Sequence, residues 1–150
     1  MAELTIIRKA THDHASDGLR VQLQATRPTL AKRRWRGVAE DGKEFGFDLD
    51  EALTHGMHFY AEGGKAYVLE QTPEEVLEIP VATVEEAARV AWSLGNLHFG
   101  VQVLPGAVRV TEDPAVLQLL SREGIAFQRV ECVFLPLSTS VNHHHEHHHG

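Results

Sequence analysis

The chain has 150 residues, of which 43% are hydrophobic, so it is long enough for one large domain or two small ones with a packed core. No apolar run approaches the roughly 20 residues of a membrane helix, and charges among the first ten residues argue against a secretory signal. The formal charge of −7 falls mostly in residues 73–150, whose 4 basic and 10 acidic side chains should attract cations and repel nucleic acid.

Residues 1–72 are expected to form short strands joined by turns. Residues 19–26 alternate apolar and polar side chains, which is the period of a half-buried strand. Asp41-Gly42 and Gly63-Gly64 are typical of turns between strands. Further extended segments are expected at 4–10, 33–39, 44–49 and 66–70. This spacing predicts a small all-β domain over residues 1–72.

After Pro73 the pattern changes to one of alternating strands and helices, over residues 73–137. The first helix should begin at Thr83, where Glu86 three residues later completes a capping box. Apolar residues at helical spacing follow as far as Gly95, which we expect in the left-handed position that ends a helix.

The second helix should begin at Asp113-Pro114, an N-cap residue followed by proline, and stop at Gly124. Strands are expected at 76–81, 101–104, 107–110 and 126–135. The resulting order, β-α-β-β-α-β, predicts a ferredoxin-like domain with both helices on one face of an antiparallel sheet. The whole chain is therefore expected to be an α+β protein.

The chain ends in a histidine-rich tail, residues 138–150, which cannot bury enough apolar surface to fold alone and should be disordered without metal. The tail holds six of the 11 histidines: His143, His144, His145, His147, His148 and His149. Neutral imidazole is a good ligand for Ni²⁺, Cu²⁺ and Zn²⁺. An artificial tag is the alternative. Glu146 interrupts the run and no linker precedes it, which favours a native tail.

His98 follows the first helix of the second domain and has two interpretations. It could interact with the helix C-terminus, where the helix dipole favours a cation. It could instead bind a metal, although one histidine per chain cannot hold an ion. Two copies meeting across a two-fold axis could, because such an interface places a residue opposite itself.

The remaining polar residues give weaker indications. Two histidine pairs lack a full ligand set and are expected to be ordinary surface residues: His12 with His14, and His55 with His58. Cys132 alternates with apolar residues and is expected to be buried rather than a ligand. Basic residues surround Trp35 in 32–36, where a solvated strand face or a docking surface for an acidic protein is favoured over nucleic acid binding. No nucleophile–base arrangement is present, so we do not expect an enzyme.

The segment from Gly95 to Gly106 carries a specific resemblance. Gly95-Asn96-Leu97-His98, followed by Gln102-Val103-Leu104-Pro105-Gly106, resembles the G-N-x-H…Q-x-x-P-G signature of the UreE family of urease accessory proteins, which carry nickel. The likeness covers nearly the whole chain, but only this segment is distinctive. The resemblance implies an N-terminal β domain that docks partners of the urease complex and a ferredoxin-like domain that forms homodimers.

The same resemblance implies the metal site and the partners. His98 from both protomers would bind one Ni²⁺ at the dimer interface, helped by the tail histidines. The protein would deliver nickel to the urease apoprotein together with an accessory GTPase. Some relatives carry further histidines after the strand matching 107–110. Here Glu112 and Asp113 stand in that place, and Asp113 is expected to cap a helix, so we expect no second histidine site.

We therefore expect a cytoplasmic nickel metallochaperone with no membrane or nucleic acid partner. Its affinity for metal should fall as the pH drops through the range in which histidines protonate, because a ligand must be deprotonated. Zn²⁺ or Cu²⁺ could substitute, and only the resemblance points to nickel. The alternative is a metal-independent protein-binding module with an artificial tail.

Overall fold

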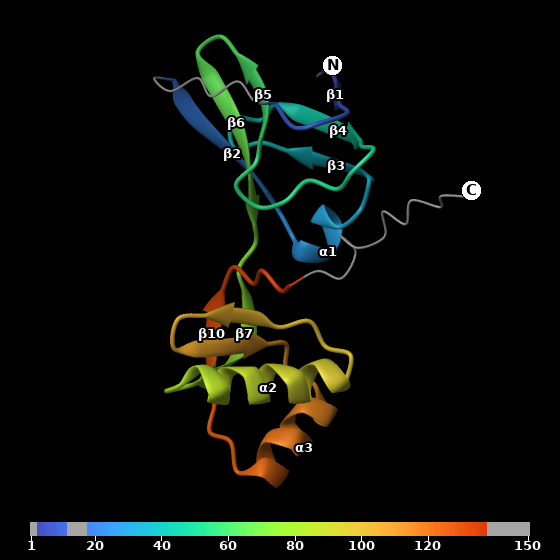
Figure 1. The fold of residues 1–150 in the computed structure, drawn as a ribbon. Helices are drawn as coiled ribbons and strands as arrows, with labels where there is room; N and C mark the ends of the chain where they lie inside the picture. The colour runs from blue at the N-terminus through green and yellow to red at the C-terminus, as the bar shows by residue number, and fades with distance from the viewer. Residues whose placement is uncertain (1–2, 12–17, 138–150) are drawn as a thin grey trace, which may run out of the picture. The chain divides into compact units, whose positions relative to one another are not determined.

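The computed structural model describes residues 3–11 and 18–137, whose course Figure 1 shows. The six tail histidines, His12 and His14 therefore lie outside the described residues. The chain divides into two compact units, Met1–Pro73 and Glu74–Gly150. The described ranges contain ten strands and three helices, which confirms the α+β class. None of these helices is both long and apolar enough to cross a bilayer.

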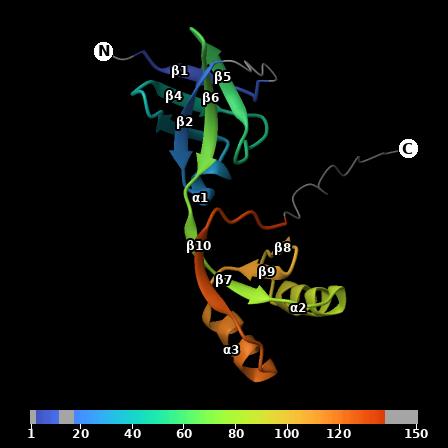
Figure 2. The same cartoon turned by 90° about the vertical axis from the view of Figure 1, so that its left-hand side faces the viewer.

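The first unit contains two three-stranded sheets. In chain order its elements are β1 Thr5–Ile7, β2 Leu19–Ala25, α1 Arg27–Leu30, β3 Arg34–Val38, β4 Glu44–Asp48, β5 His58–Glu62 and β6 Lys65–Gln71. One sheet has the order β1-β4-β3 and the other β2-β6-β5. Strands β2 and β6 run side by side and parallel (Figure 2). The alternation predicted for β2 is confirmed, because Val21 and Leu23 are buried while Arg20 and Gln22 are exposed.

Aromatic side chains from both sheets fill the core of the first unit. Phe45 is fully buried, and its ring makes edge contacts with Phe59 and Tyr67 at centroid distances of 5.0 and 5.1 Å. Trp35 stacks on Phe47 with centroids 3.9 Å apart. Edge and stacked arrangements of this kind add about 0.5–1.5 kcal/mol per pair beyond area burial. The two sheets are therefore held to one shared core.

Two elements of the first unit were not predicted, helix α1 and strand β5, and the helix is an exception to the expected all-β domain. Helix α1 is a single turn in which the Thr26 hydroxyl accepts a hydrogen bond from the Thr29 N–H and Pro28 lies in the first turn. Such a turn is too short to show an apolar period. Strand β5 has a bulge between His58 and Tyr60, and bulges break the alternation that marks a strand.

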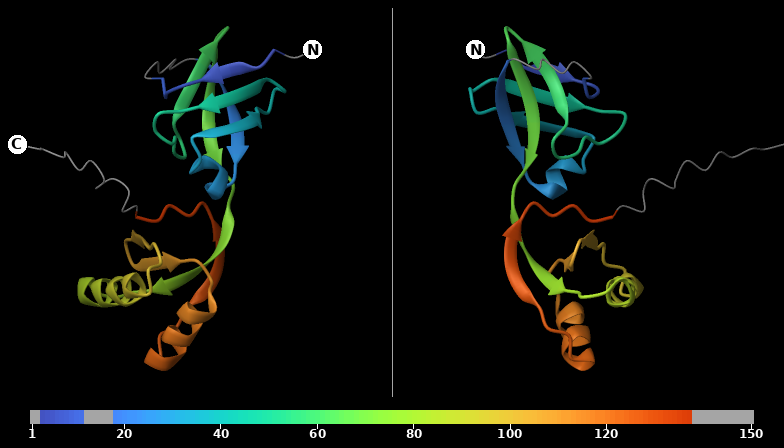
Figure 3. Two further views of the ribbon diagram at one scale, coloured as in Figure 1. Left: turned by 90° about the vertical axis from the view of Figure 1, so that its right-hand side faces the viewer. Right: turned by 60° about the vertical axis from the view of Figure 1, so that its left-hand side comes forward.

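The second unit builds one antiparallel sheet with two helices. Its elements are β7 Glu74–Pro80, α2 Val84–Asn96, β8 Gln102–Leu104, β9 Ala107–Val110, α3 Pro114–Glu123 and β10 Gln128–Cys132. The strand order is β10-β7-β9-β8. Figure 3 shows both helices on one side of the strands. One core joins the sheet to both helices: Leu77, Ile79, Val108, Val110, Val90, Leu94, Val116, Leu119 and Leu120.

Candidate metal-binding site

The site is built on the end of helix α2, whose start is fixed by a capping box. The Thr83 hydroxyl accepts a hydrogen bond from the Glu86 N–H at 3.1 Å, as the sequence predicted. The Glu86 carboxylate accepts from the Ala82 N–H at 2.6 Å, one residue before the N-cap rather than at the N-cap itself. The Thr83 side chain thus satisfies one unpaired N–H group of the helix start, and the Glu86 side chain binds the backbone that leads into it.

The end of α2 lies further along the chain than the sequence predicted. The helix continues through Gly95 to Asn96, and the residue in the left-handed position is His98, with φ at 66°. Gly95 does not have a positive φ, so the expectation that it ends the helix was wrong. His98 is the one residue other than glycine with a positive φ in the described ranges.

Hydrogen bonds and packing determine this helix end. The His98 N–H donates to the Gly95 carbonyl at 2.9 Å, and the Phe99 N–H reaches back to the Leu94 carbonyl at 3.4 Å. This pair of bonds is the Schellman motif, which ordinarily places glycine where His98 stands. Leu94 is fully buried and Phe99 packs against the same core, which is the apolar contact that accompanies the motif. Burial of the residues on either side therefore decides which residue becomes left-handed.

The His98 side chain is free to bind a ligand. It is exposed, and its imidazole makes no hydrogen bond or ion pair with any part of the chain that the structure describes. A left-handed conformation costs an ordinary residue about 1–2 kcal/mol relative to the right-handed one. Strain of this kind persists where the surrounding structure imposes it, and it is concentrated at functional sites.

His98 has no partner ligands within the described part of its own unit. No group of three histidine, cysteine, aspartate or glutamate side chains suited to a metal occurs in residues 3–11 and 18–137. Asp113 caps α3 by accepting from the Ala115 N–H at 2.9 Å, as predicted, and Glu112 pairs with Arg129. A complete coordination sphere at His98 would need donors from elsewhere.

The other candidate ligands outside the tail have structural surroundings. The His55 Nδ1 accepts a hydrogen bond from the Gln71 N–H at 2.9 Å, and the His58 Nε2 lies 3.3 Å from Arg20. Cys132 is half-buried on β10, and this burial raises the pKa of its thiol, which disfavours the thiolate that binds metals. Each of them thus has surroundings within its own unit that do not amount to a metal site.

An exposed stripe on α2 leads to His98. Trp92 is 69% exposed. Ala88, four residues before it, and Gly95, three residues after it, lie on the same side of the helix and are also exposed. A Cβ added at Gly95 would have no neighbour within 4 Å, so packing within the chain does not require glycine there. Trp92 was not among the residues predicted to be functional, although a tryptophan outside the apolar period of a helix is a usable signal of an interface.

Known proteins resemble this chain along most of its length. Residues 74–150 match the family described as UreE urease accessory protein, C-terminal domain. The Urease accessory protein UreE of Deinococcus radiodurans is 32% identical over 123 residues, which cover 81% of this chain and 79% of the relative. The protein of the same name from Bacillus cereus is 30% identical, with 77% and 78% covered. That of Beijerinckia indica is 28% identical, with 97% and 86% covered.

Proposed function

The chain belongs to the UreE family of urease accessory proteins, and on that premise we propose that it carries Ni²⁺ to apo-urease during urease maturation. The observation that supports this most directly is the exposed His98, held in a strained turn inside the family signature. A role in binding and transfer, without catalysis, agrees with the naming of the relatives as accessory proteins.

We place the nickel site between two protomers. Each would contribute His98, and the tail histidines 143–145 and 147–149 would complete the coordination sphere. The absence of partner ligands around His98 within the described residues supports this sharing, because a lone imidazole is too few ligands for an ion. Zn²⁺ or Cu²⁺ could bind the same donors, so nickel rests on the family alone.

The exposed stripe of α2 supports a homodimer through the second unit. Trp92 offers a large apolar side chain, and Gly95 allows a close approach of backbone from a second copy. A two-fold axis near this stripe would bring the two His98 rings together. The strand order β10-β7-β9-β8, with each neighbouring pair antiparallel, also supports a ferredoxin-like topology for this unit.

Transfer would proceed by ligand exchange. Tail imidazoles could leave the ion one at a time and open coordination positions to an acceptor. The urease apoprotein and the accessory GTPase, both in the cytoplasm, are the proposed partners. Binding requires neutral imidazoles, so acidification should release the metal.

Calorimetric titration of Ni²⁺ tests the site. A chain that ends at Ser140 keeps His98 and loses the tail histidines, so it should retain one tight Ni²⁺ per dimer. His98→Asn should abolish that tight site, since asparagine tolerates the left-handed conformation but lacks an imidazole. Light scattering gives the mass of the species titrated.

If the protein were a metal-independent binding module, the titrations should give the opposite results. If the shortened chain shows no tight site, and His98→Asn behaves like the parent in the full chain, the carrier function is wrong and the tail alone accounts for metal affinity. Thermal unfolding of each variant without metal excludes a trivial loss of structure.

A further inference from the structure

One face of the first unit combines exposed apolar and basic side chains. In the sheet β1-β4-β3, Ile6 pairs with Gly46 and Gly46 with Arg36, while Glu44 pairs with Val38. Side chains alternate across a strand, so these residues share the outward face, opposite the buried Phe45 and Phe47. This set of Leu4, Ile6, Arg36, Val38 and Glu44 is called the outward face below.

A glycine on the central strand makes room for apolar side chains on the outward face. A Cβ at Gly46 would lie 2.9 Å from the Ile6 Cδ1 and 3.2 Å from a Leu4 methyl, so both side chains lie across β4 in space that any other residue would fill. Ile6 is 48% and Val38 58% exposed. Exposed aliphatic residues gathered on one sheet face are typical of interaction sites.

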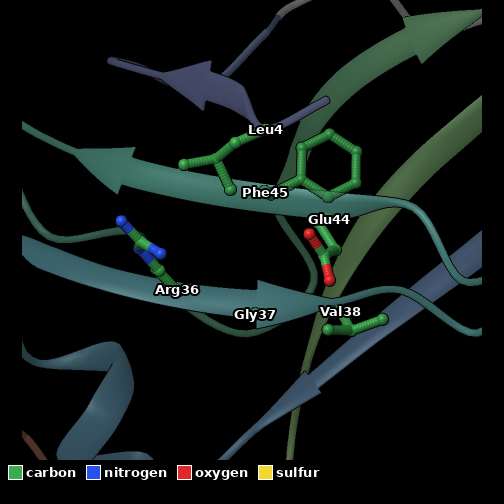
Figure 4. Close-up of a pocket in the computed structure, with 6 residues that line it drawn as sticks. All are labelled: Leu4, Arg36, Gly37, Val38, Glu44 and Phe45. Atoms are coloured by element: carbon green, nitrogen blue, oxygen red, sulfur yellow. The ribbon is translucent and has the colours of Figure 1, made fainter. Parts of the chain in front are cut away.

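Two adjoining hollows mark the outward face. One has a volume of about 240 Å³, and Leu4, Arg36, Val38 and Glu44 border it (Figure 4). The other, of about 360 Å³, lies alongside and shares Leu4 and Arg36. Together they could take alternate side chains of an extended segment, whose same-side residues repeat about every 7 Å.

The charges around the outward face indicate the charge of a segment that could bind there. Asp48 is already paired, because Arg34 and Arg8 each contact one of its carboxylate oxygens at 3.1 Å and lower the pKa of its carboxyl. Arg36 makes no ion pair with the residues described. Lys32 and Arg33, just before β3, are also exposed cations without an ion pair there. This concentration of positive charge stands out in a chain whose formal charge is −7.

We propose that the outward face docks an extended, acidic and aliphatic segment of a partner protein. A carboxylate of the segment pairs with Arg36, and an aliphatic side chain two residues away lies between Leu4 and Val38. Glu44 borders the far end of the smaller hollow, where it repels a second carboxylate and so fixes the direction of the segment. This inference does not depend on nickel binding.

A labelled peptide tests the face on the full-length protein. The probe is a ten-residue peptide of alternating glutamate and valine, and its binding is measured by fluorescence anisotropy. A peptide of alternating lysine and valine is the control. The acidic peptide should bind and the basic one should not. Higher ionic strength should weaken binding, because exposed charges are screened.

Substitutions locate the binding site. Arg36→Glu should lower the affinity for the acidic peptide about fivefold or more, since an exposed ion pair is replaced by repulsion. Val38→Ser should also weaken it, and Glu44→Gln should tighten it. Arg89→Glu makes the same charge change on α2 of the second unit and should leave binding unchanged.

Three results would overturn the proposal. Arg36→Glu and Arg89→Glu could bind the peptide equally, or the peptide could fail to bind at all. Labelled duplex DNA could bind instead and lose affinity with Arg36→Glu, which would make the face a phosphate-binding surface. Light scattering could show that Arg36→Glu changes the mass of the assembly, in which case a second copy occupies the face. Circular dichroism confirms that each variant is folded.

Discussion

Helices α2 and α3 end in the same hydrogen-bonded turn, but a different residue occupies the left-handed position in each. At the end of α3, Gly124 has φ at 67° and its N–H bonds to the Ser121 carbonyl at 3.2 Å. The Ile125 N–H reaches the Leu120 carbonyl at 2.8 Å. His98 repeats this arrangement at the end of α2 with nearly the same φ.

The difference separates a turn with little conformational cost from a turn that carries an exposed side chain. Glycine adopts the left-handed conformation without a steric penalty, so α3 ends in the least costly way. Histidine does not, and α2 accepts a penalty of about 1 kcal/mol or more at His98. The two turns share one sheet and one core, so backbone geometry alone gives no reason for histidine. What histidine adds at this position is an exposed imidazole at the end of α2.

The largest effect is expected where both turns depend on the core. Leu94 and Leu120 are 0% and 1% exposed, and their carbonyls accept the long bonds of the two turns. Leu94→Ala and Leu120→Ala should each lower the free energy of unfolding by about 2–4 kcal/mol, through lost burial and a cavity. Urea denaturation measures this. Only Leu94→Ala should also weaken Ni²⁺ binding, and equal weakening by both would remove the link between this helix end and the site.

Substitutions at His98 and Gly124 should change the free energy of unfolding in opposite directions. His98→Gly relieves strain and should raise the free energy of unfolding by about 1 kcal/mol while removing tight Ni²⁺ binding. Gly124→Ala introduces strain and should lower it by about 1 kcal/mol without changing Ni²⁺ binding. Denaturation and titration of both variants test the comparison. A loss of stability in His98→Gly would mean that the imidazole stabilises the fold.

A substitution at Gly95 tests whether this glycine matters for the stability of α2 or for contact with a second copy. Alanine at this helical position has open space and should stabilise α2 by about 0.5–1 kcal/mol. If a second copy packs on the stripe of α2, the same methyl group should weaken the dimer. Denaturation at low protein concentration and sedimentation across a concentration series separate the two effects. A dimer unaffected by Gly95→Ala would place the interface elsewhere.

The smallest effect is expected in the sheet that supports both helices. A hydrogen bond from Gln128, and Arg109 at 2.9 Å, lower the pKa of Glu78 below its ordinary 4.5. A carboxyl with a lowered folded pKa stabilises above the unfolded pKa, and this contribution is lost as the pH falls through the folded value. Glu78→Gln should therefore reduce the drop in stability between neutral pH and pH values below 4.5. An unchanged acid dependence would show that the ion pair contributes nothing net.

Local rules predicted the helix starts and one of the two helix ends. Thr83 and Asp113 cap their helices as their side chains and spacing indicate, because an N-cap needs only one side chain and the next turn of backbone. Gly124 likewise ends α3. The candidate ligand His98 was also found from the sequence, through the motif Gly95-Asn96-Leu97-His98.

The remaining features depended on contacts that a sequence pattern does not contain. Strand β5 is irregular at its bulge, and it is fixed by pairing with β6. Among the apolar residues of α2, Ala88 is exposed while Val90 and Leu94 are buried. The orientation of the helix on the sheet decides which of several apolar residues face the core.

The sequence by itself determined the α+β class, the capped helix starts and the choice of His98 as a candidate ligand, because each follows from neighbouring residues or from a short motif. Only the tertiary structure decided that α2 passes Gly95 and that His98 adopts the left-handed conformation. The reason is that Leu94 and Phe99 gain more by burial in a common core than the chain loses in strain at one residue between them.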